Sequence, residues 1–142
     1  MKRRILLGIL VAVVVLFAVI QLIPYGHNNP PVIQEPAWDN PQTRDLAVRA
    51  CYDCHSNQTV WPGYANIAPI SWALQIDVDE ARQQLNFSEW NRPQPGAAKA
   101  VEDVQSGRMP SKSYVSSQPS ANLTPEEKAA LIQGLKATLG QS

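Results

Sequence analysis

The sequence predicts an all-α protein, a bundle of about four helices preceded by a single N-terminal transmembrane helix. Three observations support this fold class. Apolar residues recur at three- and four-residue steps in four stretches after residue 37, as on the buried face of a helix. Prolines stand at or near the starts of these stretches and glycines end two of them, in the positions that helices favour. No stretch alternates apolar and polar residues as a half-buried strand does.

Length and charge narrow the possible functions. The 142 residues leave room for one small domain once the N-terminal segment is set aside. Basic and acidic residues number twelve each, and three of the basic ones precede the apolar N-terminal run. The remaining nine basic and twelve acidic residues give the rest of the chain a charge of minus three, so we expect no nucleic-acid partner. Twelve prolines and an aromatic content of 7% predict a loop-rich domain with a thin core, which a large planar apolar cofactor would complete.

Residues 5–23 read ILLGILVAVVVLFAVIQLI and predict a membrane anchor. As a helix they would span about 28 Å, enough to cross the hydrocarbon core of a bilayer. A cleaved signal peptide shares the basic start but ends at a site of small residues, whereas bulky residues and Pro24 end this run. We therefore expect an uncleaved anchor that crosses the lipid bilayer through residues 5–23, with Lys2, Arg3 and Arg4 holding the N-terminus in the cytoplasm.

Residues 24–37 predict a linker between the anchor at 1–23 and a domain at 38–142. Residues 24–36, PYGHNNPPVIQEP, carry four prolines, so we expect an extended, polyproline-like spacer and not a packed element. His27 lies in this spacer, and we interpret it as a solvated histidine.

The first two helices of the domain have clear starts. Asp39 or Asn40 can cap a helix that begins at Pro41, and Pro69 opens a second helix. The charged residues of the second helix face away from its apolar stripe and predict a solvated surface, not a carboxylate site. The expected stripe of the first helix is Leu46, Ala47, Ala50, Cys51 and Cys54, and that of the second is Ile70, Leu74, Val78, Ala81 and Leu85, opposite Asp77, Asp79, Glu80 and Arg82.

A third and a fourth helix complete the bundle. Gly107 supplies the left-handed residue that ends the third, and residues 124–127 (TPEE) form a capping box for the last helix, which ends at Gly140. Residues 56–69 and 111–122 lack a helical period and predict loops. The expected inner faces are Ala97, Ala98, Val101 and Val104 in the third helix and Leu131, Ile132, Leu135 and Leu139 in the fourth.

Residues 51–55 read CYDCH, the C-x-x-C-H signature of c-type haem attachment. Two thiols three residues apart on a helical turn lie on the same side, so each can add to one vinyl group of the same porphyrin. The histidine that follows then turns its imidazole toward the iron. The sequence therefore predicts haem c (iron), covalently attached through Cys51 and Cys54, with His55 as an iron ligand.

Other uses of the two cysteines fit the sequence less well. A thioredoxin-like redox pair belongs beside a strand-helix-strand pattern, and no strand is predicted near Cys51. A disulfide across two intervening residues closes a very small loop and stabilises little. A structural zinc site needs four ligands, and the whole chain has two cysteines and two histidines.

Met109 is the candidate for the second axial iron ligand. It follows the stop of the third helix directly, and the only other methionine is the initiator. A thioether suits haem iron, and a His/Met pair raises the reduction potential of a cytochrome. No histidine other than His27 is available for the sixth position, although Met109 could also be a gap-filling core residue. Pro110 would stiffen the loop that holds the sulfur.

Further side chains could contact the porphyrin. Trp61 and Trp72 are large apolar residues that we expect at the cofactor, with ordinary core packing as the alternative for each. Arg108 and Lys112 could meet the haem propionates, although exposed charges often make no specific contact.

The chain resembles the small bacterial haem-binding domain family, which has a cytochrome c-like fold and typically a single membrane anchor followed by one c-type haem domain. The resemblance covers most of residues 30–139 and implies thioether bonds at Cys51 and Cys54, His55 as the proximal ligand and Met109 as the distal ligand. The matching segments are CYDCHSN (51–57), WP (61–62), IAPISW (67–72), DV (77–78), LNFSEW (85–90), GRMP (107–110) and LTPEEKAAL (123–131).

These features predict a membrane-anchored monohaem c-type cytochrome that transfers single electrons. Bacteria attach haem to such cysteines outside the cytoplasmic (inner) membrane, so we expect a single-pass protein with its haem domain in the periplasm and redox partner proteins in the membrane or periplasm. We expect no enzymatic activity, because His55 and Met109 would leave no site for substrate at the iron. The alternatives are a haem-based sensor with an exchangeable sixth ligand, and a thiol-redox or metal-binding protein.

Overall fold

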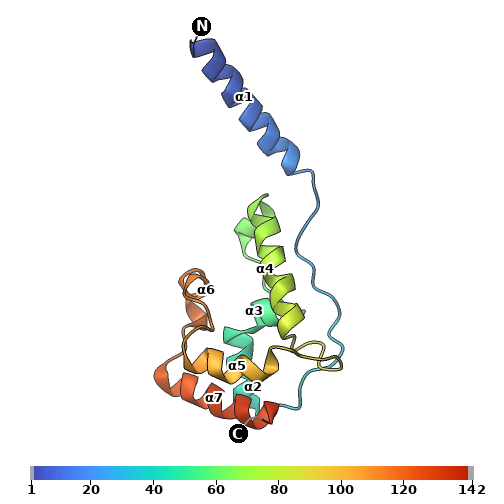
Figure 1. The fold of residues 1–142 in the computed structure, drawn as a ribbon, viewed down its shortest axis with the longest axis vertical. Coiled ribbons are helices and arrows are strands. Elements are labelled where there is room, and N and C mark those ends of the chain that lie inside the picture. The colour runs from blue at the N-terminus through green and yellow to red at the C-terminus, as the bar shows by residue number, and fades with distance from the viewer. Residues whose placement is uncertain (1, 141–142) are drawn as a thin grey trace. The chain divides into compact units, whose positions relative to one another are not determined.

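The computed structural model describes residues 2–140, and in that range its regular elements are helices, with no strand (Figure 1). Its seven α-helices and two 3-10 helices confirm the prediction of an all-α fold. All four helices that the sequence predicts after residue 37 are present: α2 (Pro41–Ala50), α4 (Ile70–Gln84), α5 (Ala97–Gln105) and α7 (Pro125–Leu139).

The chain divides into two compact units. Unit 1 consists of residues 1–28 and 61–76, and unit 2 consists of residues 29–60 and 77–142. The division passes through α4, which contributes its first half to unit 1 and its second half to unit 2. No pattern in the sequence predicts this grouping, because residues 61–76 are distant along the chain from the N-terminal residues that they contact.

The N-terminal apolar run forms α1 (Lys2–Ile20), of which no residue is buried. Within residues 2–140, α1 is the one helix long and apolar enough to cross a membrane. It ends at Ile20, three residues before the end of the predicted span at residue 23. A membrane-spanning role for α1 stays a prediction.

Residues 21–28 contact the segment that leads into α4. This segment, predicted as an irregular loop, contains a short 3-10 helix, η1 (Gly63–Asn66). His27 Nε2 lies 2.7 Å from the carbonyl oxygen of Ala65, and the centroid of its ring lies 5.1 Å from that of Trp61. The interpretation of His27 as a purely solvated linker residue is therefore wrong, although its side chain is exposed.

The second half of the predicted spacer packs on unit 2. The backbone N–H groups of Ile33 and Gln34 donate to the carbonyl oxygen of Ser88 at 2.8 and 3.1 Å, and the N–H of Trp90 donates to the carbonyl of Gln34 at 2.9 Å. Pro36 is buried. The expectation of an unpacked spacer is wrong for this half. Backbone hydrogen bonds attach it to unit 2, and such bonds need no periodic pattern of apolar residues that a sequence would reveal.

The cysteine motif does not continue the first helix as predicted. α2 is capped by Asn40 and begins at Pro41, as expected, but it ends at Ala50. Cys51 then leaves helical geometry, with φ −128° and ψ −33°, and a separate turn, α3 (Tyr52–His55), follows. The two cysteines are therefore presented by a short turn whose direction differs from that of α2.

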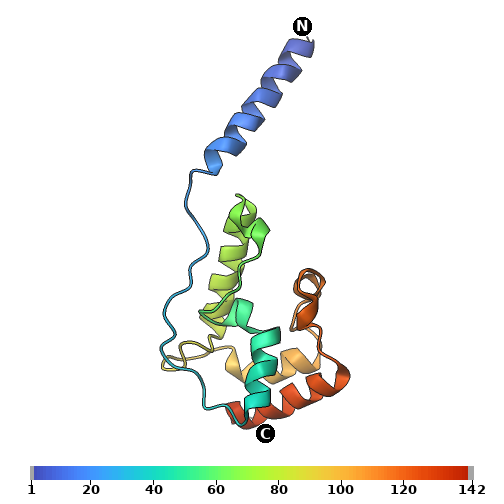
Figure 2. The same ribbon diagram turned by 180° about the vertical axis from the view of Figure 1, so that it is seen from behind.

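α7 closes the core of unit 2 against α2 and α5 (Figure 2). Its N-terminus carries the predicted capping box between Thr124 and Glu127, and Gly140 ends it with φ 65°. Gly134 allows the close approach to α2, since a Cβ at this position would overlap the buried side chain of Thr43. The buried core of unit 2 includes Leu46, Tyr52, Phe87, Val101, Val104, Leu131 and Leu135.

The sides of α4 are only partly those predicted. Val78 in α4 and Leu85, one residue after its end, are buried as expected, whereas Ile70 is 46% exposed. Arg82, expected in solvent, is buried because its guanidinium donates to the carbonyl of Ser56 at 2.8 Å and to the hydroxyl of Thr59 at 3.0 Å. A charged side chain with several acceptors can be buried where the apolar period alone would place it outside.

The segment after α5 is also more ordered than predicted. α5 ends where expected, and Gly107 follows it with φ 74°. The predicted loop at 111–122 contains α6 (Lys112–Ser117) and a 3-10 helix, η2 (Pro119–Ala121). The Ser111 hydroxyl caps α6, but none of the residues of α6 is buried, so the sequence carries no apolar stripe that would reveal it.

Candidate functional site

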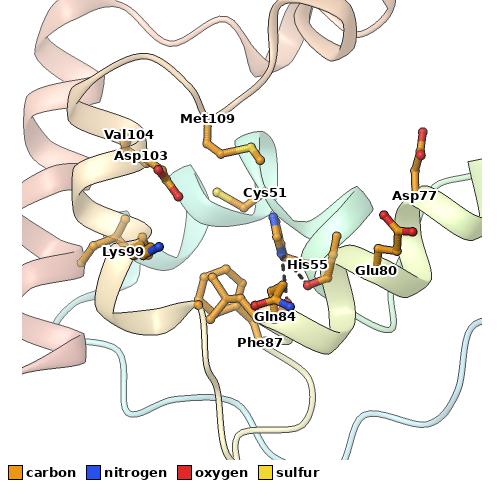
Figure 3. Close-up of a pocket in the computed structure, with 15 residues that line it drawn as sticks. Cys51, His55, Asp77, Glu80, Gln84, Phe87, Lys99, Asp103, Val104 and Met109 are labelled. Atoms are coloured by element: carbon orange, nitrogen blue, oxygen red, sulfur yellow. Dashed lines mark hydrogen bonds between the residues drawn. The ribbon is translucent and has the colours of Figure 1, made fainter.

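Unit 2 contains a cavity of about 400 Å³ that holds three of the predicted site residues, Cys51, His55 and Met109 (Figure 3). This volume falls in the range of roughly 300–1,000 Å³ that is typical of small-molecule and cofactor sites. The residues that line the cavity are Cys51, His55, Asp77, Glu80, Ala81, Gln84, Leu85, Phe87, Gly96, Lys99, Ala100, Asp103, Val104, Met109 and Leu135.

Two backbone carbonyls, one in α4 and one just after it, hold His55 in one tautomer. Its Nδ1 lies 3.0 Å from the carbonyl oxygen of Leu85 and 3.2 Å from that of Ala81 (Figure 3). Because carbonyl oxygens only accept, Nδ1 carries the proton and Nε2 keeps its lone pair. A metal-binding histidine usually donates the N–H of its other ring nitrogen to a carboxylate or a backbone carbonyl, and this hydrogen bond fixes the orientation of the ring.

The imidazole of His55 is kept neutral. Burial lowers the pKa of its imidazolium form, and the two carbonyl contacts only partly oppose this effect. A neutral imidazole is the form that binds iron, because the protonated ring has no free lone pair. Tautomer and charge state both suit an axial ligand.

The chain on both sides of His55 is fixed by a buried polar network. The carbonyl of His55 accepts the backbone N–H of Phe87 at 2.8 Å. Asn57, two residues later, accepts from the side-chain amide of Asn86 at 2.8 Å and its backbone N–H donates to the Ser88 hydroxyl at 2.9 Å. All three polar side chains are at most 3% exposed, so breaking one of these bonds would leave a buried group without a partner.

The two cysteines are free thiols in an apolar setting. Burial raises the pKa of Cys51 to about 12 and that of Cys54 to about 11. Reactive redox thiols have the opposite property, a lowered pKa, so the thioredoxin-like alternative gains no support. Cys51 lines the cavity, whereas Cys54 is not among its lining residues.

Met109 lies at the cavity on the loop after α5 (Figure 3). Its backbone N–H donates to the carbonyl of Asp103 at 3.0 Å, and its side chain is 43% exposed. Pro110, half-buried, follows it outside the set of lining residues. Arg108 pairs with Glu102 and Asp103 at 2.8 and 2.6 Å, and its expected contact with a propionate stays a prediction.

One side-chain bond connects the cysteine turn with the segment after Met109. The hydroxyl of Tyr114 in α6 donates to Asp53 Oδ2 at 2.8 Å. Asp53 stands between the two cysteines, and its other carboxylate oxygen accepts the backbone N–H of Val60 at 3.0 Å. The segments that carry the two candidate iron ligands are therefore tied to each other.

Trp61 and Trp72 belong to unit 1, and neither is among the residues that line the cavity. The indole nitrogens of both are buried, with no hydrogen-bond partner in the described part of the chain. Their expected contact with a porphyrin stays a prediction.

Sequence reasoning missed several residues of the site. The carbonyls of Ala81 and Leu85 carry no side-chain signal, and Phe87 and Lys99 were not singled out. Phe87 is 1% exposed, lines the cavity and stacks on Tyr52 with ring centroids 5.7 Å apart. Lys99 is the only lysine or arginine among the described residues that line the cavity, which makes it a second candidate for contact with a propionate.

The residues present fit a haem. Apolar side chains cover the walls, a neutral histidine and a thioether supply iron ligands, and a thiol adjoins them. Residues 2–140 hold no group of three or more His, Cys, Asp and Glu residues placed to bind a metal ion.

The chain matches a family model described as a haem-binding domain over residues 15–137, well over half of its length. No curated protein and no solved structure matches it. Haem, the cofactor that the C-x-x-C-H signature predicts, is thus confirmed as the ligand of this domain. The chain belongs to the haem-binding domain family.

Proposed function

We propose that this protein is a membrane-anchored monohaem c-type cytochrome that transfers single electrons on the periplasmic side. The observation that carries the proposal is His55, a neutral imidazole whose Nδ1 is tied to the carbonyls of Ala81 and Leu85 beside a cavity that Met109 also lines. Such a site supports two axial ligands and electron transfer, with no position for a substrate at the iron.

Each residue has a distinct role in holding the cofactor. The thiols of Cys51 and Cys54 each add across a vinyl group, with the sulfur bonding to one carbon and the proton going to the other. His55 Nε2 and the Met109 sulfur are the proposed axial ligands. When bound, haem supplies an iron that alternates between the ferrous and ferric states.

The partner is proposed to be a redox protein with a basic docking patch. Three carboxylates, Asp77, Glu80 and Asp103, and one ammonium group, Lys99, line the cavity. Complementary charge raises the rate of encounter between redox proteins, and ionic strength weakens the effect. An electron-transfer rate that falls with added salt would agree with this proposal.

The second candidate function is a haem-based sensor with an exchangeable sixth ligand. The 43% exposure of Met109 favours it, because a half-exposed side chain is easier to displace than a buried one. The thiol-redox alternative has no comparable support, given the raised pKa values of both cysteines.

A redox and ligand-binding study of the full chain, produced in a bacterial host with cytochrome c maturation and solubilised in detergent, tests the proposal. The electron carrier predicts reversible one-electron titration, a methionine-to-iron charge-transfer band and no binding of carbon monoxide to the reduced protein. Rapid binding of carbon monoxide to the wild-type protein would favour the sensor. A colourless product with two titratable thiols would contradict both.

A further inference from the structure

The charged residues of unit 1 are confined to the start of α1, at Lys2, Arg3 and Arg4. Neither residues 5–28 nor residues 61–76 contain an aspartate, glutamate, lysine or arginine. The second segment, WPGYANIAPISWALQI, lies outside the predicted membrane anchor. It nevertheless consists mainly of apolar and aromatic residues and contains no charged side chain.

The end of α1 is attached to this second segment by paired hydrogen bonds. The side-chain amide of Gln21 donates to the carbonyl of Ala68 at 3.1 Å and accepts from its N–H at 2.9 Å. The N–H of Asn28 donates to the side chain of Gln75 at 3.0 Å. Residues 21–28 therefore run along residues 61–75, and the end of α1 lies beside the start of α4 (Figures 1 and 2).

Large apolar side chains of this segment are exposed. Tyr64 and Ile67 are each 45% exposed and Ile70 is 46% exposed. Just after α1, Leu22 is 81% and Tyr25 46% exposed. Exposed apolar groups close together along one segment are a feature of surfaces that contact a membrane or another protein.

We propose that η1 and the start of α4 form a membrane-interface surface, with Tyr64, Ile67 and Ile70 in the boundary between lipid headgroups and acyl chains. The inference rests on the proposed anchor: if α1 spans the bilayer, Gln21 ends the span and Ala68 is fixed beside it. Tyrosine and tryptophan are enriched at this depth of membranes, and the segment contains both.

Lipid is favoured over a protein partner by the chemistry of the surface. A protein interface typically surrounds its apolar core with a polar rim, and residues 61–76 carry no charge that could contribute to such a rim. A bilayer interface requires only apolar and aromatic groups with satisfied backbone polar groups. The hydrogen bonds from Gln21 and His27 supply the latter at Ala68 and Ala65.

Spin labels on the full-length haem protein in vesicles of phosphatidylcholine and phosphatidylglycerol test the proposal. Ile67→Cys and Ile70→Cys report on the surface, and Val14→Cys reports on the anchor. Val48→Cys in α2 is the matched control, because Val48 is an apolar residue of similar exposure, 41%, in unit 2. The wild-type protein is the labelling blank, and the visible spectrum of each variant checks that it has folded around haem.

We expect the ratio of accessibility to oxygen over accessibility to a nickel chelate to be several-fold higher at residues 67 and 70 than at residue 48. If residue 14 is deep in lipid while residues 67 and 70 resemble residue 48, the surface faces water and the inference is overturned, with the anchor intact. If residue 14 is itself exposed to water, the anchor fails and the inference with it. Spin–spin broadening at residue 67 that dilution with unlabelled protein removes would show a second copy on the surface, which also overturns it.

Discussion

The two candidate iron ligands differ in how firmly the fold holds them. His55 is half-buried, is bonded at Nδ1 to the carbonyls of Ala81 in α4 and of Leu85 just after α4, and is flanked by the Asn57–Asn86–Ser88 network. Met109 is 43% exposed, and its own contact is one backbone hydrogen bond to Asp103. The histidine side of the cavity is thus organised before any cofactor arrives, whereas the methionine side can adapt to it.

This difference has a functional meaning. In a preorganised histidine the ring already has the orientation that iron binding needs. The hydrogen bond from Nδ1 also tunes the basicity of Nε2, the nitrogen proposed to bind iron. A methionine on a lightly held loop sets the reduction potential when bound, and its loss opens the iron. An electron carrier and a ligand sensor would therefore differ only in whether the Met109 loop keeps its sulfur on the iron or releases it.

Removal of His55 should have the largest effect. We expect His55→Ala to abolish stable haem incorporation, because both the proximal ligand and the bonds to Ala81 and Leu85 are lost. The measurement is Soret absorbance per polypeptide, with Val48→Ala on the exposed side of α2 as the control. Wild-type haem content in His55→Ala would contradict the role of this residue.

Removal of Met109 should leave the haem attached and change the iron. We expect Met109→Ala to lower the reduction potential by on the order of 0.1 V, a fraction of the ~0.8 V range that axial ligands span. Carbon monoxide should then bind to the reduced protein. If the substituted protein keeps the spectrum and potential of the wild type, Met109 is not the sixth ligand.

The network behind His55 should affect stability more than ligation. We expect Asn57→Ala to lower the free energy of unfolding by about 1–3 kcal/mol, because it removes the side-chain partner of the buried Asn86 amide and of the Pro31 carbonyl. Thermal unfolding followed by circular dichroism measures this change. Gln58→Ala, at the exposed neighbouring position, should be close to neutral; equal losses in the two variants would contradict the account.

Acid should lower the stability of the folded protein through Glu89, which accepts a hydrogen bond from the side chain of Asn57. Hydrogen bonds from Asn57 and Arg92 lower the pKa of Glu89 below its ordinary value of 4.5. The folded protein therefore binds this proton less readily than the unfolded chain, and the stabilisation is present above pH 4.5 and is lost as pH falls through the lowered pKa. We expect Glu89→Gln to show a flatter decline of stability below pH 4.5 than the wild type; parallel declines would exclude Glu89 as a source.

Loss of the hydrogen bond between Tyr114 and Asp53, which connects the histidine and methionine sides of the cavity, should have the smallest effect. We expect Tyr114→Phe to lower the free energy of unfolding by about 0.5–1.5 kcal/mol, because it removes the bond to Asp53. The freed loop should also let carbon monoxide compete faster for the reduced iron. Tyr64→Phe is the control for loss of a tyrosine hydroxyl, and equal rates in the two variants would show that the bond does not hold the Met109 loop.

Local signals in the sequence predicted much of the fold. The capping box at 124–127, the proline starts and the glycine stops each depend on a few neighbouring residues, and all are present. The CYDCH motif is local in the same sense, because its chemistry lies within five residues. Such features do not depend on how distant segments pack.

The rest depends on tertiary contacts that leave little trace in the sequence. The bonds from His55 to Ala81 and Leu85 use backbone carbonyls, which every residue has. Arg82 is buried because acceptors from distant segments surround it, and an apolar period cannot predict that. The grouping of residues 61–76 with the end of α1 likewise follows from bonds between segments far apart in the chain.

The central claim is that haem is bound to this chain through sulfur. Intact mass measurement of the denatured full-length protein, made with the cytochrome c maturation machinery, tests it most directly. The account predicts a mass increase of one haem in the wild type, and no such stable adduct when Cys51→Ala and Cys54→Ala are combined. A wild-type polypeptide with the unmodified mass, from a host that matures other c-type cytochromes, would contradict it.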